Sequence, residues 1–217
     1  MKILAVNGSP RKGWNTSKLL EHALEGAKSV GGETEEIVNL YDLNFRGCVS
    51  CFRCRVKEGG HPGRCAVRDD LSSILDRMAE YGGLLIGSPI YLWDVTSQTR
   101  AFLERLIYSN LAYRAENRSE YKGKTNAGFI YSMNATEERM KTSGYDFLFK
   151  SHMHFLSFLN GRARYMTSND TWQFDDYAKY DVPLFDPAAK AEVRREQFPK
   201  DCKRAFEIGA GLVQSRR

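Results

Sequence analysis

Short apolar runs that alternate with stretches of helical spacing are the feature that most constrains the fold of this chain. The run at residues 2–6, KILAV, has the length of a buried strand and ends in the turn sequence Asn-Gly-Ser-Pro. The segment that follows repeats apolar residues at helical spacing and ends at Gly31 and Gly32. The alternation recurs along the chain, and it predicts a parallel β-sheet with helices on both faces.

Four further segments have the composition of strands, at residues 33–40, 84–91, 125–133 and 161–168. With the first run they give five predicted strands, which suit a flavodoxin-like, doubly wound α/β domain with strand order 2-1-3-4-5. Sheets of this kind bind ligands beyond the carboxyl ends of their strands. We therefore expect the loops after the first, third and fourth strands to form the functional site.

Helical spacing predicts further helices, which begin after Asp69 or Asp70, span residues 97–108 and span residues 137–159. Residues 170–185 are aromatic and polar, and we expect a long ordered loop there. Asp186 and Pro187 match a helix N-cap followed by proline in the first turn, so we predict a C-terminal helical extension over about 186–214. The length suits one sizeable core, so residues 1–217 are predicted to form a single domain.

The composition bounds the compartment and the partners. Hydrophobic residues make up 42% of the chain, charged residues 27%, and the formal net charge is +5. No apolar run is long enough to span a membrane, and the apolar part of MKILAVNGSP is too short for a signal peptide. We therefore expect a cytoplasmic protein without a membrane partner. The positive charges form no dense stripe, which argues against nucleic-acid binding.

The loop after the first predicted strand, NGSPRKGWNTSK, leads directly into a helix. A helix start presents free amide groups and the positive end of the helix dipole, which suits a phosphate. The loop lacks both the Walker A signature and the dinucleotide G-x-G-x-x-G signature. An ordinary polar turn is the alternative. The candidate phosphate-binding side chains are Ser9, Arg11, Asn15, Thr16 and Ser17.

The loop after the third predicted strand, SPIYLWDVTSQ, is apolar and aromatic. Loops of this composition at strand ends often hold a flat ligand. Pro89 stiffens the turn, and the residues that follow it supply apolar surface, namely Ile90, Tyr91, Leu92 and Trp93. A hydrophobic lid or a contact between subunits explains this loop equally well.

Four of the five cysteines are crowded between residues 47 and 65: Cys48, Cys51, Cys54 and Cys65. The cytosol keeps thiols reduced, so a metal-binding or catalytic cluster is favoured over structural disulfides. The Cys-x2-Cys-x2-Cys spacing is that of bacterial iron–sulfur ligation, whereas structural zinc more often uses two separated pairs. An iron–sulfur cluster, bare thiols and zinc all remain open at this point.

The two loops together resemble the NADPH-dependent FMN reductase family, in the segments GSPRKGWNTSKLL and GSPIYLWDVTSQTRAFLERL. The resemblance implies that Ser9, Arg11, Asn15, Thr16 and Ser17 surround the FMN phosphate. It also implies that Pro89, Ile90, Tyr91 and Leu92 lie against the isoalloxazine ring. The loop after the fourth strand, with Ser132 and Asn134, occupies the family's third flavin-contacting position.

The cysteine run, followed by Asp69 and Asp70, resembles the iron–sulfur flavoprotein subgroup of that family. The resemblance implies a [4Fe–4S] cluster beside the FMN, with Cys48, Cys51, Cys54 and Cys65 as its ligands. The gap between Cys54 and Cys65 is longer than in the compact motif of the subgroup. Flavin reductases with similar cysteines and no cluster also occur in the wider family.

The resemblance implies an FMN-dependent oxidoreductase that passes electrons from NAD(P)H to the flavin. The electrons then go to a quinone, to another small acceptor or to an adjacent iron–sulfur cluster. Because the flavin carries the chemistry, no catalytic side chain is predicted. The alternative is an electron-carrier iron–sulfur flavoprotein without its own small-molecule substrate. Related flavoproteins imply a homodimer or homotetramer, whereas the acceptor and the choice between NADH and NADPH stay open.

Overall fold

A sheet of seven strands forms the centre of the computed structural model, which describes residues 1–116 and 118–214. The strands are β1 (Lys2–Asn7), β2 (Glu33–Thr34), β3 (Val38–Asn39), β4 (Gly83–Tyr91), β5 (Asp94–Val95), β6 (Thr125–Ser132) and β7 (Asn160–Ser168). Their order is β2-β1-β4-β6-β7, with β3 also paired to β1 and β5 to β4. The predicted α/β class and the order 2-1-3-4-5 are confirmed. The last three residues of the predicted domain lie outside the described part.

The prediction of five strands was wrong for two local reasons. The predicted second strand is interrupted after Thr34, and its two halves, β2 and β3, pair separately with β1 in parallel. The chain also turns back after β4, so that Asp94 and Val95 pair antiparallel with Tyr91 and Ile90 as β5. The remaining pairings, β1 with β4, β4 with β6 and β6 with β7, are all parallel.

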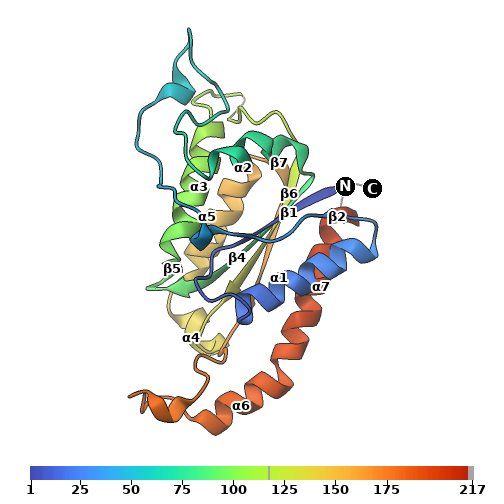
Figure 1. Ribbon diagram of the computed structural model, residues 1–217, viewed down its shortest axis with the longest axis vertical. Coiled ribbons are helices and arrows are strands. Elements are labelled where there is room, and N and C mark those ends of the chain that lie inside the picture. Colours follow the sequence, from blue (N-terminus) through green and yellow to red (C-terminus); the bar gives the residue numbers. More distant parts are fainter. Residues whose placement is uncertain (117, 215–217) are drawn as a thin grey trace.

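Helices cover both faces of the sheet, as Figure 1 shows. On one face lie α1 (Asn15–Ser29) and α7 (Phe198–Gln214), and on the other lie α3 (Ser97–Asn110) and α5 (Tyr145–Ser157). Successive residues of β1 point to opposite faces, so Ile3 joins the core under α1 and α7 and Leu4 joins the core on the other side. Each fully buried side chain of this size contributes about 1.5–3 kcal/mol.

The C-terminal helices belong to the main body of the fold. Asp186 caps α6 (Pro187–Glu196) by accepting hydrogen bonds from the amides of Ala188 and Ala189, as the sequence predicts. Helix α7 then packs so closely on α1 that a Cβ at Gly209 would lie 1.7 Å from the carbonyl oxygen of Ala23. The absence of a side chain at this position lets the two helices pack with their backbones nearly in contact.

Two helices differ from the sequence prediction. The predicted helix over residues 137–159 is divided into α4 (Glu137–Thr142) and α5 by Gly144, whose φ of +78° does not continue a helix. The helix predicted after Asp69 is short, because α2 (Ser72–Arg77) passes into a 3-10 turn at Met78. Among the described residues, no helix combines the length and the apolar content that a membrane span requires.

Candidate functional site

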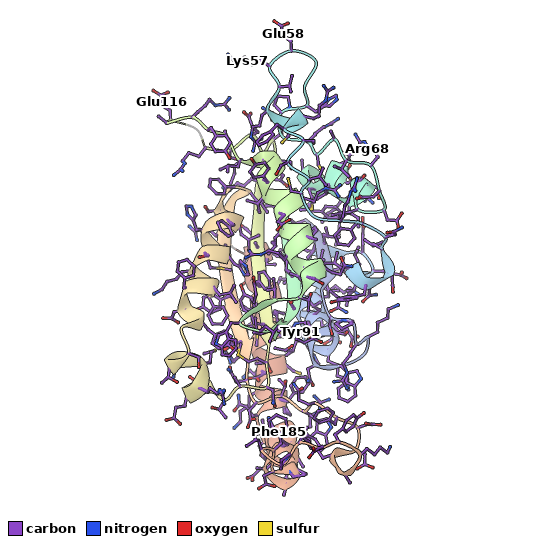
Figure 2. All side chains as sticks on the ribbon, turned by 90° about the vertical axis from the view of Figure 1, so that its left-hand side faces the viewer. Lys57, Glu58, Arg68, Tyr91, Glu116 and Phe185 are labelled. Carbon is purple, nitrogen blue, oxygen red and sulfur yellow. The ribbon has the colours of Figure 1, made fainter. Side chains whose placement is uncertain are left out.

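Loops that follow β1, β4, β6 and β7 meet at the carboxyl edge of the sheet and enclose a cavity of about 180 Å³. Nine of the eleven predicted cofactor-binding residues line it: Ser9, Arg11, Asn15, Thr16, Pro89, Ile90, Tyr91, Ser132 and Asn134. These nine residues, which come from three of the four segments, therefore lie around one cavity, and their contact with a cofactor stays a prediction. Figure 2 labels Tyr91, which lies between the two ends of the elongated molecule.

The first loop and the start of α1 form one end of the cavity. The amide of Ser9 donates to Asn7 Oδ1 at 3.0 Å, and the amide of Arg11 donates to Ser9 Oγ at 3.2 Å. No side chain caps the N-terminus of α1, whereas Thr96 caps α3. The first amides of α1 and its dipole therefore offer this end of the cavity donors that suit an anion such as a phosphate.

Contacts at Gly8 hold the loop after β1 against the end of β4 and the start of α3. Its amide donates to the carbonyl oxygen of Gly87 at 2.8 Å, and its own carbonyl oxygen accepts from Thr96 Oγ1 at 2.7 Å. A Cβ at Gly8 would lie only 1.7 Å from Thr99 Oγ1. Only glycine allows this approach, which places Ser9 beside the end of β4.

The other end of the cavity is apolar. Pro89, Ile90 and Tyr91 at the end of β4 form a wall, and the Tyr91 side chain is about half exposed. Beyond Tyr91, Leu92 and Trp93 make a two-residue hairpin turn with φ values of +49° and +66°. Such angles favour glycine or asparagine, so two bulky residues here carry backbone strain.

Two predicted residues do not line the cavity. Ser17 Oγ accepts from Asn7 Nδ2 and from the amide of Gly13, both at 3.2 Å, and so supports the first loop from behind. Leu92 is 91% exposed at the tip of the hairpin. Its position in the turn directs it to solvent rather than to the cavity wall.

Five lining residues were missed from the sequence: Trp14, Met133, Thr171, Trp172 and Gln173. Three of them follow β7, whose carboxyl end lies at the same edge of the sheet. Because ligands bind at that edge, the predicted fifth strand could have indicated that the segment after it contributes to the site. Asn15 Nδ2 donates to the carbonyl oxygen of Trp172 at 2.8 Å, and Arg11 Nη1 donates to that of Gln173 at 2.5 Å. The segment after β7 thereby closes the polar end of the cavity.

The cysteine loop packs along the C-terminal half of α3, away from this cavity. The amide of Cys48 donates to Glu104 Oε2 at 3.2 Å, and Arg105 Nε donates to Cys65 Sγ at 3.0 Å. Figure 2 shows the loop tip, at Lys57 and Glu58, at one end of the molecule. The cysteine loop of one chain therefore does not lie beside its own cavity, in contrast to what the resemblance implied.

The thiols match a metal site in kind but are not gathered around one point. All four are free, with Cys54 buried and Cys51 exposed, and burial raises the pKa of Cys54. In the part of the chain that the structure describes, no three His, Cys, Asp or Glu side chains converge as a metal ion requires. The donor set fits thiolate ligation of an iron–sulfur cluster. The loop would have to close for all four to ligate.

Arg105 anchors the base of the cysteine loop from inside the protein. Its side chain is fully buried, with Nη1 bonded to Asp69 Oδ2 at 2.7 Å and to the carbonyl oxygen of Arg46 at 3.0 Å. Burial opposes ionisation of Asp69, but the hydrogen bond and charge of Arg105 prevail and hold the pKa of Asp69 below its ordinary value. Both ends of the loop are thus fixed to α3 through one guanidinium group.

Comparison with known sequences identifies relatives for most of the chain. The profile of the NADPH-dependent FMN reductase family matches residues 1–157. An iron–sulfur flavoprotein of Methanocaldococcus jannaschii is 31% identical over 118 residues, which are 54% of this chain and 58% of that protein. The aligned part of this chain spans about half the length of the curated relatives it matches.

Comparison with solved structures extends over the whole fold. An NAD(P)H:quinone oxidoreductase from Methanothermobacter marburgensis superposes with a TM-score of 0.70 at 20% identity and covers 98% of both chains. An FMN-dependent NADH-azoreductase from Bacillus anthracis, in complex with FMN, superposes with a TM-score of 0.63 at 16% identity. It covers 98% of this chain and 100% of that one. At these identities the likeness establishes the flavodoxin-like fold.

Proposed function

Because the chain belongs to the NADPH-dependent FMN reductase family, we propose that it is an FMN-dependent NAD(P)H oxidoreductase. Electrons pass from a nicotinamide through bound FMN to a small acceptor such as a quinone. The observation that carries the proposal is the cavity itself, in which three predicted loops meet at the uncapped N-terminus of α1. The names of two solved neighbours, a quinone oxidoreductase and an azoreductase, support a small acceptor.

The lining residues divide into a polar and an apolar group. Ser9 and Arg11 in the loop after β1, with Asn15 and Thr16 in the first turn of α1, are assigned to the phosphate. Pro89, Ile90 and Tyr91 are assigned to the isoalloxazine ring, and Ser132 at the end of β6 and Asn134 in the loop after it are assigned to the third contact with the flavin. Ser17 supports the loop, and Leu92 is assigned no contact with the cofactor of its own chain.

Bound FMN supplies the hydride-accepting chemistry, and the residues of the chain bind and orient it. Arg11 lies over the Trp14 ring, 3.5 Å from its centroid, while its Nη1 is bonded to Gln173. The guanidinium therefore stands at the mouth of the polar end, where it can exchange the Gln173 carbonyl for a phosphate oxygen. The half-exposed Tyr91 leaves the apolar end accessible to a nicotinamide or an acceptor.

We further propose that the cysteine loop holds a [4Fe–4S] cluster through Cys48, Cys51, Cys54 and Cys65. The support is the set of four free thiols on one segment together with the names of the curated relatives, which are iron–sulfur flavoproteins. Because an iron–sulfur cluster transfers electrons, the electron-carrier function is the second candidate. In that case reduced flavin would pass electrons to another protein rather than to a small molecule.

The proposal also covers assembly and location. Leu92 and Trp93 are 91% and 57% exposed, and adjacent exposed apolar residues of this size mark a contact surface. We therefore propose a homodimer or homotetramer in the cytoplasm, without a nucleic-acid or membrane partner. Sedimentation of the purified protein measures the assembly directly.

The enzyme and the carrier are separated by two measurements. The cofactor released by heat is identified by mass, and steady-state oxidation of NADPH and NADH is followed with a soluble quinone. FMN together with many turnovers per flavin supports the oxidoreductase. FMN with a single turnover and no steady state supports the carrier, whereas recovery of FAD, or of no flavin after reconstitution, contradicts both.

A further inference from the structure

The described residues that line the proposed FMN cavity include none from helix α6, yet two side chains of this helix are bonded to residues that do line it. Lys190 and Arg194 are four positions apart, so they project from the same face of the helix. Figure 1 shows α6 at the opposite end of the molecule from the cysteine loop. The family profile ends at residue 157, so α6 lies outside the matched part of the chain.

Lys190 fixes the orientation of the Asn134 side chain. It is only 5% exposed, and its ammonium group donates to Asn134 Oδ1 and pairs with Asp170. An ammonium group can only donate, so the amide oxygen of Asn134 must face it and the amide nitrogen must point elsewhere. Within the described part of the chain this Nδ2 has no hydrogen-bond partner, yet it is not buried. An accessible donor therefore remains on a residue that lines the cavity.

Arg194 makes the equivalent contact at the start of α1. Its Nη1 donates to Asn15 Oδ1 at 2.9 Å, while Asn15 Nδ2 donates to the carbonyl oxygen of Trp172 at 2.8 Å. The opposite amide orientation would set Nδ2 against the guanidinium and Oδ1 against a carbonyl oxygen, so both contacts exclude it. The amide nitrogen carries two hydrogens, and Trp172 accepts only one. Asn15 thus keeps a second N–H for a ligand at the phosphate end.

The charge of Arg194 acts on this amide rather than on an ion pair. Among the described residues, Asn15 is the one hydrogen-bond acceptor of the guanidinium, and no carboxylate pairs with it. Partial burial lowers the pKa of Arg194 below its ordinary value, and the group packs 4.1 Å from the centroid of the Phe198 ring. Linked hydrogen bonds polarise one another, so a cation on Oδ1 makes the N–H groups of the same amide better donors to an anion.

We propose that α6 completes the FMN site from outside the cavity, with Arg194 positioning Asn15 for the phosphate and Lys190 positioning Asn134 for the third contact with the flavin. Both are positioning residues, since each acts through the asparagine that it holds. The inference rests on the function proposed above and adds two residues to it. FMN affinity then depends on a helix that the family profile does not cover.

The test measures the affinity of the flavin-free protein for FMN and for riboflavin, which lacks the phosphate, by fluorescence titration. Arg194→Met keeps apolar contact with Phe198 but removes the guanidinium. It should weaken FMN binding about tenfold and leave riboflavin binding unchanged, whereas purely structural damage would weaken both flavins alike. Arg195→Met is the matched control, because Arg195 is exposed on the same helix and pairs with its neighbour Glu196. It should change neither affinity.

Two double-mutant cycles show whether each cation acts through its asparagine. In an Asn15→Ala background, Arg194→Met should change FMN affinity by less than about twofold, because the group that it positions is already absent. Lys190→Met is combined with Asp170→Asn, so that no carboxylate is left unpaired. This pair of changes should weaken FMN and riboflavin equally in the wild-type background and should have little effect in an Asn134→Ala background.

The two cycles are independent, so poor folding of one variant leaves the other cycle to decide. The inference is overturned if Arg194→Met keeps the wild-type ratio of FMN to riboflavin affinity, or if the losses add in either cycle. A wild-type protein that binds no FMN contradicts the function proposed above and this inference with it. FMN binding with additive losses contradicts this inference alone.

Discussion

Thr16 Oγ1 and Ser132 Oγ lie 2.8 Å apart and join the start of α1 to the end of β6 across 116 residues of sequence. Both side chains are buried, and both residues line the cavity that we propose binds FMN. The sequence assigns Thr16 to the phosphate alone. In the structure its hydroxyl also holds two of the cavity's loops together, so its removal affects folding as well as cofactor affinity.

Thr16→Val should lower the stability of the apoprotein by about 1–3 kcal/mol, because it leaves the buried Ser132 hydroxyl without this partner. Urea unfolding of flavin-free protein measures the effect. Thr142→Val, at an exposed position at the end of α4, is the control and should change stability by less than about 0.5 kcal/mol. Equal stability of Thr16→Val and wild type would show that the Thr16 hydroxyl does not stabilise the fold.

Arg11→Ala should weaken FMN binding roughly 10- to 100-fold, the range for loss of a charge-assisted hydrogen bond. Melting of the apoprotein should change little, because the Arg11 side chain is exposed and its contacts, to Trp14 and Gln173, lie at the surface. Flavin fluorescence titration measures the affinity. Arg68→Ala removes an exposed ion pair with Asp76 elsewhere and should leave FMN affinity unchanged.

Gly8→Ala should destabilise the protein by about 2–3 kcal/mol, since the new methyl group would collide with Thr99 Oγ1. Gly13→Ala offers a comparison in the same loop. Nothing lies within 4 Å of a Cβ there, and only the φ of +72° resists the change, at a cost of about 1–2 kcal/mol. Thermal melting of the two variants should rank Gly8→Ala as the less stable, and the reverse order would contradict the packing of the first loop on α3.

The sheet order could be predicted because buried strands leave a strong pattern, as in residues 2–6 and 84–91. The site loops followed from the strand order, and the structure brings nine of the predicted residues to one cavity, while their contact with FMN stays a prediction. The pattern of apolar residues does not determine the local geometry of the loops. Nothing in the sequence alone shows that the Ser17 hydroxyl accepts hydrogen bonds from Asn7 and Gly13. Nor does the sequence show that the hairpin turn directs Leu92 to solvent.

The sequence failed to show two other features for one reason, which is that apolar spacing reveals neither a break in a helix nor the depth of a side chain. Apolar residues continue at helical spacing across Gly144, so the break between α4 and α5 was not visible. The burial of His152 was not visible either, because a single polar residue two positions from His154 carries no apolar pattern. Its ring is stacked on Phe129 with centroids 5.3 Å apart, inside a cluster that forms only when α5 packs on the sheet.

The buried His152 should make stability depend on pH. Its pKa is about 4 in the folded protein against 6.5 ordinarily, so the unfolded chain binds the proton more readily. Stability is therefore full above about pH 6.5 and falls as the pH drops towards about 4, by roughly 3 kcal/mol in total. Urea unfolding of wild type and His152→Gln between these pH values measures the difference. The variant should lose less stability than wild type, whereas His154→Gln should behave like wild type, and parallel curves for all three would contradict a neutral, buried His152.

The cysteine loop should take up iron and sulfide when the protein is reconstituted without oxygen. Four free thiols lie on one segment, and its ends are fixed to α3 by Arg105, so closure of the loop between them can bring the thiols together. Gly59 and Gly63 already have positive φ values, which permits the tight bends that ligation needs.

Iron and sulfide analysis, with paramagnetic resonance of the reduced protein, should show one [4Fe–4S] cluster in wild type and none in Cys51→Ala/Cys54→Ala. Cys202→Ala is the matched control, because Cys202 is a buried thiol on α7 outside the loop and should not affect iron uptake. If wild type binds no more iron and sulfide than the double variant, the loop is a set of free thiols and the protein is a flavin reductase without a cluster.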